Sequence, residues 1–348
     1  MGRWVLMLLL SAGVALGPGC AKPAGVLFAP GDGASVWPPP PDEPRIRFAG
    51  EIRSAADLKP GRSTGEGLAS LLFGSEPAPG MVSPMGVCTD GADRVFIADS
   101  TAQVLHVLDL RTREHERWKP GEGAPEFLSP VAVAFDEAGG RVLVSDSGVG
   151  AVFAFDLRGR YLGLLGRGAV SRPCGVAVQP GTGRVAVADV AAHEVVLLSG
   201  DGVRVGGVGG RGREAGQFNF PTYVAFGEDG RLYVADSLNF RVQVFSPGLE
   251  PLAQIGGKGD MPGYFAQPKG VAVSKAGQLF VTDANFEAVQ VFDGAGVLLM
   301  TFGREGRGPG EFWLPAGVAV DAKGRVWIAD SRNRRVQVFE LIPAGGVP

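Results

Sequence analysis

The chain has 348 residues and a formal net charge of −3, so its bulk charge gives no general attraction to nucleic acid. It contains 55 glycines, about twice the usual share, and only three histidines, which are too few for a histidine-rich metal site. We interpret the glycines as the turn residues of a chain with many short strands.

Residues 1–20 are predicted to be a lipoprotein-type export signal. Arg3 supplies a positive charge, and the apolar stretch from Trp4 to Leu16 is too short to span a bilayer. Small residues then precede Cys20, as in a bacterial lipobox, although the expected leucine lies one position too early, at Leu16. We therefore expect Cys20 to be lipidated. The protein would be an exported, membrane-anchored lipoprotein facing the periplasm or the cell surface, and Ala21 after the cysteine favours the outer membrane. Ordinary secretion and an uncleaved anchor are the alternatives.

Residues 21–43 are predicted to be a proline-rich tether. Four prolines follow Trp37, and because proline restricts its own φ and the residue before it, we interpret this segment as a semi-rigid spacer. A polyproline recognition motif is the alternative reading. Residues 45–52 then read as one strand, with Ile46 and Phe48 on a common face.

From residue 80 onward one phrase returns six times: a proline, two apolar runs, an aspartate and a glycine-rich loop. The prolines are Pro84, Pro130, Pro173, Pro221, Pro268 and Pro315. The aspartates are Asp99, Asp146, Asp189, Asp236, Asp283 and Asp330, spaced 47, 43, 47, 47 and 47 residues apart. A period near 47 residues with several short strands is typical of a propeller.

Each repeat reads as four strands. In the fifth they are predicted over 270–274, 279–283, 288–292 and 297–302. The sixth repeat ends too early for a fourth strand, so we expect residues 45–52 to supply it. The predicted fold class is therefore all-β: a six-bladed β-propeller of four-stranded antiparallel blades over residues 44–348, with the last blade closed by an N-terminal strand.

Two repeats resemble the NHL repeat, at residues 233–245 and 317–339, where Ala-Asp-Ser is followed by Asn, Arg and Val-Gln-Val-Phe. The resemblance is looser in the first three repeats. The chain also resembles uncharacterised bacterial NHL-repeat lipoproteins. The resemblance implies a six-bladed propeller but no single activity, since NHL domains include RNA-binding modules, protein-interaction modules and a peptide-amidating lyase.

The repeated aspartates are expected to be structural, because each can accept backbone N–H bonds at a turn and a catalytic residue needs to occur only once. The better binding candidates lie in the glycine-rich loops between blades, which open on one face. They are Arg211, Arg213, Lys258, Tyr264, Arg304, Arg307 and Trp313. Cations beside aromatic rings can hold an anionic polymer or a sugar. The alternative is that the cations are only solvated and the rings fill gaps between blades.

The residue after each leading proline should line the mouth of the central channel. These residues are Met85, Val131, Cys174, Thr222, Lys269 and Ala316, of which Lys269 alone is a candidate for anchoring a ligand. No carboxylate is among them, and we expect His106, His115 and His193 not to converge. We therefore predict no metal and no cofactor. Cys88 and Cys174 fall on blades that are not neighbours and are expected to be free thiols.

The sequence favours a non-enzymatic binding or scaffold module for a protein or a polysaccharide of the cell envelope, present as a monomer and anchored to the membrane through Cys20. The alternative is a lyase or hydrolase that uses the channel mouth, in the manner of lactonase-like or amidating-lyase-like propellers. Nucleic acid is not expected as a partner, because export separates the chain from RNA.

Overall fold

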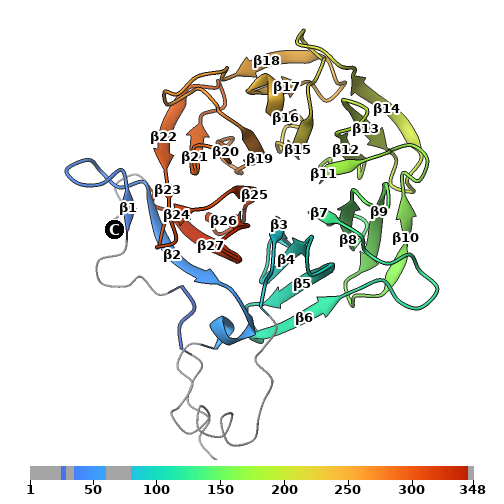
Figure 1. Cartoon of the computed structure of the whole chain (residues 1–348), viewed down its shortest axis with the longest axis horizontal. Coiled ribbons are helices and arrows are strands. Elements are labelled where there is room, and N and C mark those ends of the chain that lie inside the picture. Colours follow the sequence, from blue (N-terminus) through green and yellow to red (C-terminus); the bar gives the residue numbers. More distant parts are fainter. Residues whose placement is uncertain (1–24, 29–34, 60–79, 344–348) are drawn as a thin grey trace, which may run out of the picture.

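The six predicted blades form one ring. The computed structural model describes residues 25–28, 35–59 and 80–343, and these residues build six antiparallel sheets around a central axis (Figure 1). The chain runs around the ring in order, so blade 4 lies across the ring from blade 1 (Figure 1). The predicted fold class is confirmed.

The first five blades each contain four consecutive strands. Blade 1 consists of β3 (Pro84–Thr89), β4 (Arg94–Asp99), β5 (Val104–Asp109) and β6 (Glu114–Trp118). Blade 2 consists of β7 (Pro130–Asp136), β8 (Arg141–Asp146), β9 (Ala151–Asp156) and β10 (Tyr161–Leu165). Blade 3 consists of β11 (Pro173–Val178), β12 (Val185–Asp189), β13 (Glu194–Leu198) and β14 (Arg204–Gly209). Blade 4 consists of β15 (Pro221–Phe226), β16 (Leu232–Asp236), β17 (Arg241–Phe245) and β18 (Pro251–Ile255). Blade 5 consists of β19 (Pro268–Val273), β20 (Leu279–Asp283), β21 (Ala288–Phe292) and β22 (Leu298–Phe302).

Blade 6 is assembled from both ends of the chain. It contains β25 (Pro315–Val320), β26 (Arg325–Asp330) and β27 (Arg335–Leu341), and β2 (Ile46–Ile52) pairs antiparallel with β27. Ile46 and Ile52 are fully buried, so the closing strand is anchored by its apolar side chains. The predicted closure by an N-terminal strand is confirmed.

The predicted spacer is wrong for Val36 and Trp37. These two residues form β1 (Val36–Trp37), which pairs with β2 as a fifth strand of blade 6. The Trp37 ring lies 6.0 Å from the ring of Phe302 and 5.8 Å from that of Phe339. Burial of an indole against two rings outweighs the freedom of an exposed tether. The predicted export signal, including Cys20, lies outside the described residues.

The first strand of every blade lines the axis, and these strands approach one another closely. A Cβ on Gly317 of β25 would lie 2.7 Å from the carbonyl oxygen of Met85 in β3. Tyr223 of β15 fills the space at the axis. Its hydroxyl donates to the carbonyl of Met85 at 2.9 Å or that of Val131 at 3.2 Å. One side chain of blade 4 thereby reaches blades 1 and 2 and closes the channel below its mouth.

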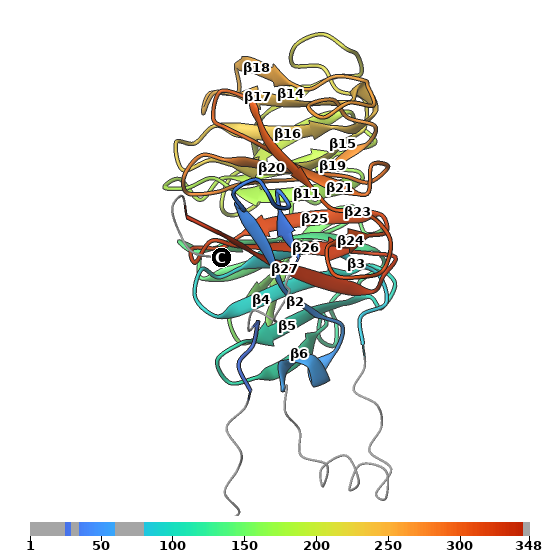
Figure 2. The ribbon, with the colours of Figure 1, turned by 90° about the vertical axis from the view of Figure 1, so that its left-hand side faces the viewer.

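The ring has two unlike faces. We call the face that carries the connections between blades and the turns from second to third strands the loop face. The opposite face, with the turns from first to second and from third to fourth strands, is the turn face. A small parallel pair, β23 (Arg304–Glu305) and β24 (Glu311–Phe312), marks the loop face (Figure 2). Two short 3₁₀ helices, η1 (Ala55–Leu58) and η2 (Ser237–Asn239), complete the described elements.

Candidate functional site

The six repeated aspartates hold the loop face together. Each is essentially buried, and its carboxylate accepts backbone N–H bonds from the loop that enters its own blade. Asp146, for example, accepts from the backbone of Ser129 at 3.0 Å and from that of Val149 at 3.0 Å, so it ties the entering loop to the turn after β8. The predicted structural role is confirmed.

The motif residues that follow the aspartate also bind the loop that enters their blade. In blade 4, Arg241 donates to Asp236 at 2.8 Å and to the carbonyls of Glu214 and Gln217 at 3.0 Å. Gln243 donates to the carbonyl of Gln217 at 2.8 Å. Asn333, Arg335 and Gln337 repeat this pattern in blade 6. The motif therefore fixes the shape of two inter-blade loops.

The aromatic residues of these loops divide into two groups. Phe218, Phe265 and Phe312 are fully buried and fill gaps between blades, as the alternative reading proposed for the rings. Their neighbours stay at the surface: Phe220 is 38% exposed, Tyr264 48% and Trp313 40%. Each of three consecutive loops on the loop face therefore exposes one large aromatic ring.

Two of the predicted cations lie over aromatic rings. The Lys258 ammonium is 5.4 Å from the centre of the Phe240 ring, and the Arg307 guanidinium is 5.1 Å from that of Trp313. Arg211 and Arg213 are exposed. Arg304 differs from the others, because Glu311 accepts from its guanidinium at 2.8 Å and neutralises its charge. We call the exposed residues, together with the half-buried Phe240 beneath Lys258, the loop patch: Arg211, Arg213, Phe220, Phe240, Lys258, Tyr264, Arg307 and Trp313.

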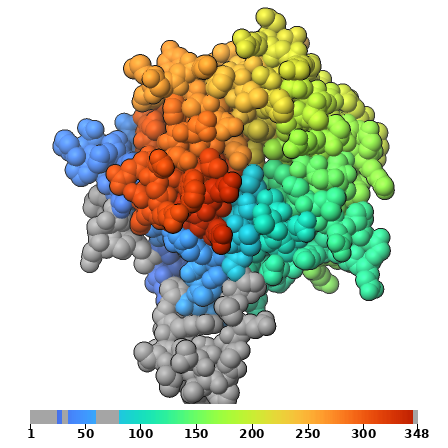
Figure 3. Space-filling model, viewed as in Figure 1, coloured from blue at the N-terminus to red at the C-terminus, as the bar shows by residue number. Residues whose placement is uncertain are grey.

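The loop patch extends over the half of the ring that is formed by blades 4, 5 and 6. Its residues come from the loops before blades 4, 5 and 6 and from the turn before β17. In the space-filling view, blades 4 and 5 occupy the upper part of the molecule, and the described residues of the N-terminal segment, in blue, lie at its left and lower left (Figure 3). Beside Phe240 and Lys258 a hollow of about 490 Å³ opens, lined also by Asp260 and Phe286. The patch therefore combines rings, cations and one concave surface.

A second group of candidates lies at the channel mouth. Lys269 is half-buried, and burial lowers the pKa of its ammonium. Glu287, whose charge acts on Lys269, has a pKa raised to about 7, chiefly by burial and against the effect of the Leu314 N–H that it accepts at 2.6 Å. Val131 and Ala316, also expected at the mouth, are buried. Lys269 is thus the one expected mouth residue with a charge.

Phe240 and Glu287 were not predicted as site residues. They occupy equivalent positions, four residues after the repeated aspartates, where every blade has positive φ. The six residues there are Gln103, Gly150, His193, Phe240, Glu287 and Arg334. Non-glycine residues are uncommon in this conformation, yet five different side chains and one glycine occupy this backbone position on the loop face. That variation within a constant position is the signal that could have identified them.

The prediction that the histidines do not converge is wrong for His106 and His115. His106 Nδ1 lies 2.9 Å from His115 Nε2, and His106 Nε2 lies 3.3 Å from a carboxylate oxygen of Asp99. Because the Asp99 carboxylate accepts a hydrogen bond, His106 carries its proton on Nε2. When both rings are neutral, Nε2 of His115 therefore donates to Nδ1 of His106. His106 takes the place of the glutamine that binds the aspartate in other blades, and β-pairing brings β6 beside it.

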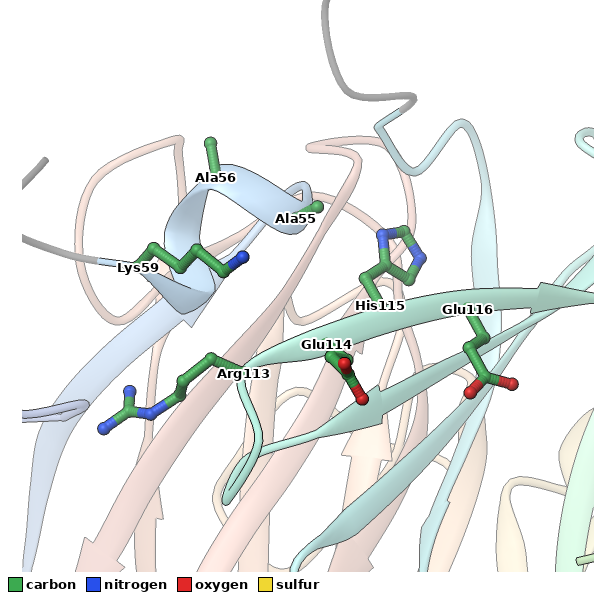
Figure 4. A pocket seen from close by; sticks show the side chains of 7 residues that line it. All are labelled: Ala55, Ala56, Lys59, Arg113, Glu114, His115 and Glu116. Atoms are coloured by element: carbon green, nitrogen blue, oxygen red, sulfur yellow. The ribbon is translucent and has the colours of Figure 1, made fainter. Parts of the chain in front are cut away.

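His115 lies beside a surface cavity at the outer edge of blade 1. The cavity has a volume of about 450 Å³ and is lined by Ala55, Lys59, Arg113 and Glu114 among others (Figure 4). Burial, the neighbouring His106 and Arg117 lower the pKa of His115 to about 4. The ring is therefore neutral at ordinary pH. This cavity is remote from the loop patch.

Within residues 25–28, 35–59 and 80–343, no three His, Cys, Asp or Glu side chains come together as a metal site. Cys88 and Cys174 are free, as predicted, and burial raises the thiol pKa of Cys174 to about 11.

No helix in the described segments is long and apolar enough to cross a bilayer.

Comparisons with known proteins agree with the fold. The NHL repeat model matches residues 218–245 and 312–339. No curated protein matches the sequence. Virginiamycin B lyase from Staphylococcus aureus superposes with a TM-score of 0.55 at 13% identity, covering 75% of this chain and 96% of the lyase. An auxiliary nutrient binding protein from Bacteroides thetaiotaomicron gives 0.60 at 10% identity, covering 76% and 70%.

A third similar structure is the nidogen/laminin complex, with a TM-score of 0.54 at 17% identity, covering 72% of this chain and 89% of the matched one. At such low identities these similarities support the fold alone. The two NHL matches coincide with blades 4 and 6, where the aspartate, asparagine, arginine and glutamine hold the loops. The chain is a six-bladed β-propeller that carries NHL repeats in its fourth and sixth blades.

Proposed function

We propose that the chain is an exported lipoprotein, anchored through Cys20, whose loop patch binds a protein or a polysaccharide of the cell envelope without catalysis. The observation that carries this proposal is the arrangement of Lys258 over Phe240 and of Arg307 over Trp313. Rings and cations at one surface suit a partner with sugar rings or with acidic and aromatic groups.

The rigidity of the loops supports binding over a structural role for the patch. The loop before blade 4 is tied down by Arg241 and Gln243, so Arg211 and Phe220 are displayed on fixed backbone. A pre-ordered surface loses less entropy when a partner binds. Because Tyr223 fills the axis, a large ligand meets the loop face and not a through-channel.

The anchor and the patch can be tested separately. Labelling with a radioactive fatty acid should mark the wild-type protein and not a Cys20→Ala variant. For the patch, Arg211, Lys258 and Arg307 are replaced together by alanine. The matched control replaces Arg158, Arg184 and Lys275, three exposed cations of the turn face, and removes the same charge.

We expect the wild type and the turn-face control to retain the same envelope partner after solubilisation, and the patch variant to lose it. For a purified envelope polysaccharide, the readout is the fluorescence of Trp313, with Trp313→Phe as the control. A partner retained equally by all three proteins, or none retained by any, would remove the support for the loop patch.

One observation favours an enzyme at the channel mouth as the second candidate. Glu287, with a pKa of about 7, lies near the cation of Lys269, and a group that titrates near neutral pH is suited to proton transfer. Virginiamycin B lyase shows that this fold can carry a lyase site. Metal analysis of the purified protein discriminates: stoichiometric calcium or zinc would favour the enzyme.

A further inference from the structure

The segment 25–28 is bound to the ring. The guanidinium of Arg113 donates to the carbonyl of Gly25 at 3.3 Å, and the ring of Phe28 meets that of Trp327 edge-on at 5.6 Å. Leu27 and Phe28 pack against a core cluster built by blades 6 and 1. These contacts fasten the chain only a few residues after Cys20.

The closing strand is shaped to receive Phe28. A Cβ on Gly50 would lie 2.9 Å from a ring carbon of Phe28, closer than two carbon atoms can approach. Gly50 has no left-handed φ that would require glycine. The missing side chain in the middle of β2 therefore makes room for the phenylalanine.

The attachment of residues 25–28 to the ring shortens the free chain between Cys20 and the ring. If residues 21–43 were free, Cys20 could be separated from the ring by roughly 80 Å of extended chain. Since Gly25 is held, only the five steps from Cys20 to Gly25 remain, and these span at most about 18 Å. A lipid on Cys20 would bring the attachment point of the segment close to the bilayer.

The attachment point and the loop patch lie on opposite faces. Arg113 belongs to the turn between β5 and β6, which is on the turn face, and Trp327 donates to Asp321 of the turn between β25 and β26 on the same face. Figure 2 shows the dark blue segment 25–28 beside β2, on the side away from β23 and β24. Arg211 and Phe220 of the loop patch lie at blade 4, across the ring from blade 1, whereas Arg307 and Trp313 lie in the loop that enters blade 6.

We propose that the turn-face edge of blades 6 and 1 is the surface that faces the anchoring membrane, and that the loop patch points away from it. This inference rests on the lipid anchor of the proposed function. The partner then approaches from the aqueous side or from the opposite layer of the envelope. A partner embedded in the anchoring bilayer would not reach the patch.

Energy transfer to membrane lipids tests the orientation. A donor dye is attached to a cysteine introduced either by Arg111→Cys, in the β5–β6 turn, or by Arg211→Cys, on the loop patch. The acceptor dye is attached to lipid headgroups in phosphatidylcholine vesicles. One arm uses the natively lipidated protein. A second arm replaces residues 1–20 with a histidine tag bound to nickel-chelating lipid. Protein without an introduced cysteine reports background labelling of Cys88 and Cys174.

We expect severalfold stronger transfer from the dye at position 111 than from the dye at position 211 in both arms. Inserting eight glycine and serine residues between Cys20 and Gly25 should abolish this difference without touching the fold. Phe28→Ala combined with Arg113→Ala should do the same, and unchanged binding of the partner in solution would show that the patch is intact.

Equal transfer from the two positions in the tagged arm would overturn the proposed orientation. So would a difference that survives the insertion, since it would then not depend on the short connection. If the native arm shows no membrane association but the tagged arm shows the expected difference, the lipid anchor of the proposed function fails and the geometry of the attachment stands.

Discussion

The hydroxyl of Tyr223 links blade 4 to two blades that are not its neighbours. It lies 2.9 Å from the carbonyl of Met85 and 3.2 Å from that of Val131, and burial raises its pKa well above the usual value. The sequence shows a tyrosine at this position, where the other blades have glycine or alanine, but it does not show which groups the hydroxyl meets. The sequence predicted the strand correctly, but the convergence of three blades on one atom is a property of the closed ring.

Tyr223→Phe is expected to destabilise the protein by about 1–3 kcal/mol, because it leaves buried carbonyls without their donor. Chemical denaturation measures the change. Tyr233→Phe is the matched control, since the Tyr233 hydroxyl makes no hydrogen bond within the described residues and its loss should have a smaller effect. Equal effects of the two substitutions would contradict the role of the Tyr223 hydroxyl.

The His106 and His115 pair makes stability depend on pH. The pKa of His115 falls from its ordinary 6.5 to about 4 in the folded state, because burial, His106 and Arg117 disfavour its protonation. The unfolded chain therefore binds this proton first as the pH falls. The stabilising contribution is fully present above pH 6.5 and is lost between pH 6.5 and about 4.

We expect His115→Gln to flatten the fall in unfolding free energy between pH 7.5 and 4.5, because the variant amide can still donate to His106 but does not titrate. Glu287 acts in the opposite sense, since its raised pKa adds stability as the pH falls from about 7. The informative quantity is therefore the difference between wild type and variant at each pH. An identical slope in both proteins would count against the histidine pair as its source.

At the scale of the strands, prediction from sequence was accurate where the hydrophobic period was clear. The fifth blade was expected over 279–283 and 288–292, and β20 and β21 have these bounds. β1 was missed, because a two-residue strand followed by prolines has no period to detect. What holds Trp37 is the tertiary contact with Phe302 and Phe339, which no local pattern contains.

The candidate site was predictable to a similar extent. The loops were located correctly, because glycine-rich segments between strands must lie at the surface. The sequence did not reveal that Phe218 is buried while Phe220 is exposed, since both are aromatic residues in one loop. It also did not reveal that Glu311 neutralises Arg304, because that pairing depends on the parallel bridge between β23 and β24.

The closing strand is the element whose loss should affect the ring most. Ile52 of β2 is fully buried in the cluster shared by blades 6 and 1, so Ile52→Ala should cost about 2–5 kcal/mol. Arg45→Ala, at an exposed position before the strand, should cost little. Deleting residues 44–52 should lower the melting temperature far more. An unchanged melting temperature after that deletion would argue against closure by β2.

At the scale of the whole molecule, hydroxyl side chains join successive blades near the axis. Thr222 of blade 4 donates to the carbonyl of Lys269 in blade 5 at 3.0 Å, and Thr282 of blade 5 donates to that of Ala316 in blade 6 at 2.6 Å. Ser331 of blade 6 donates to the carbonyl of Pro84 in blade 1 at 2.6 Å and so crosses the seam. Because of these bonds, the stability of each blade depends on its neighbour.

The seam between blades 6 and 1 is therefore where a small change should affect the entire ring. A Cβ on Gly317 would lie 2.7 Å from the Met85 carbonyl oxygen and 3.0 Å from the Gly86 Cα. Both are backbone atoms, which cannot move away by a side-chain rotation. Gly317→Ala should destabilise the protein by about 1–3 kcal/mol as the inner strands are forced apart.

The matched control for Gly317→Ala is Gly294→Ala, because an added methyl group at position 294 meets no atom closer than 3.7 Å and the backbone there is not left-handed. Both variants are compared by urea denaturation followed through fluorescence and circular dichroism. If the ring unfolds as a unit, Gly317→Ala shifts the midpoint of both signals together and Gly294→Ala shifts neither. Loss of blade 6 alone, seen as a separate early transition in the variant, would show that the seam closes the ring without making its unfolding cooperative.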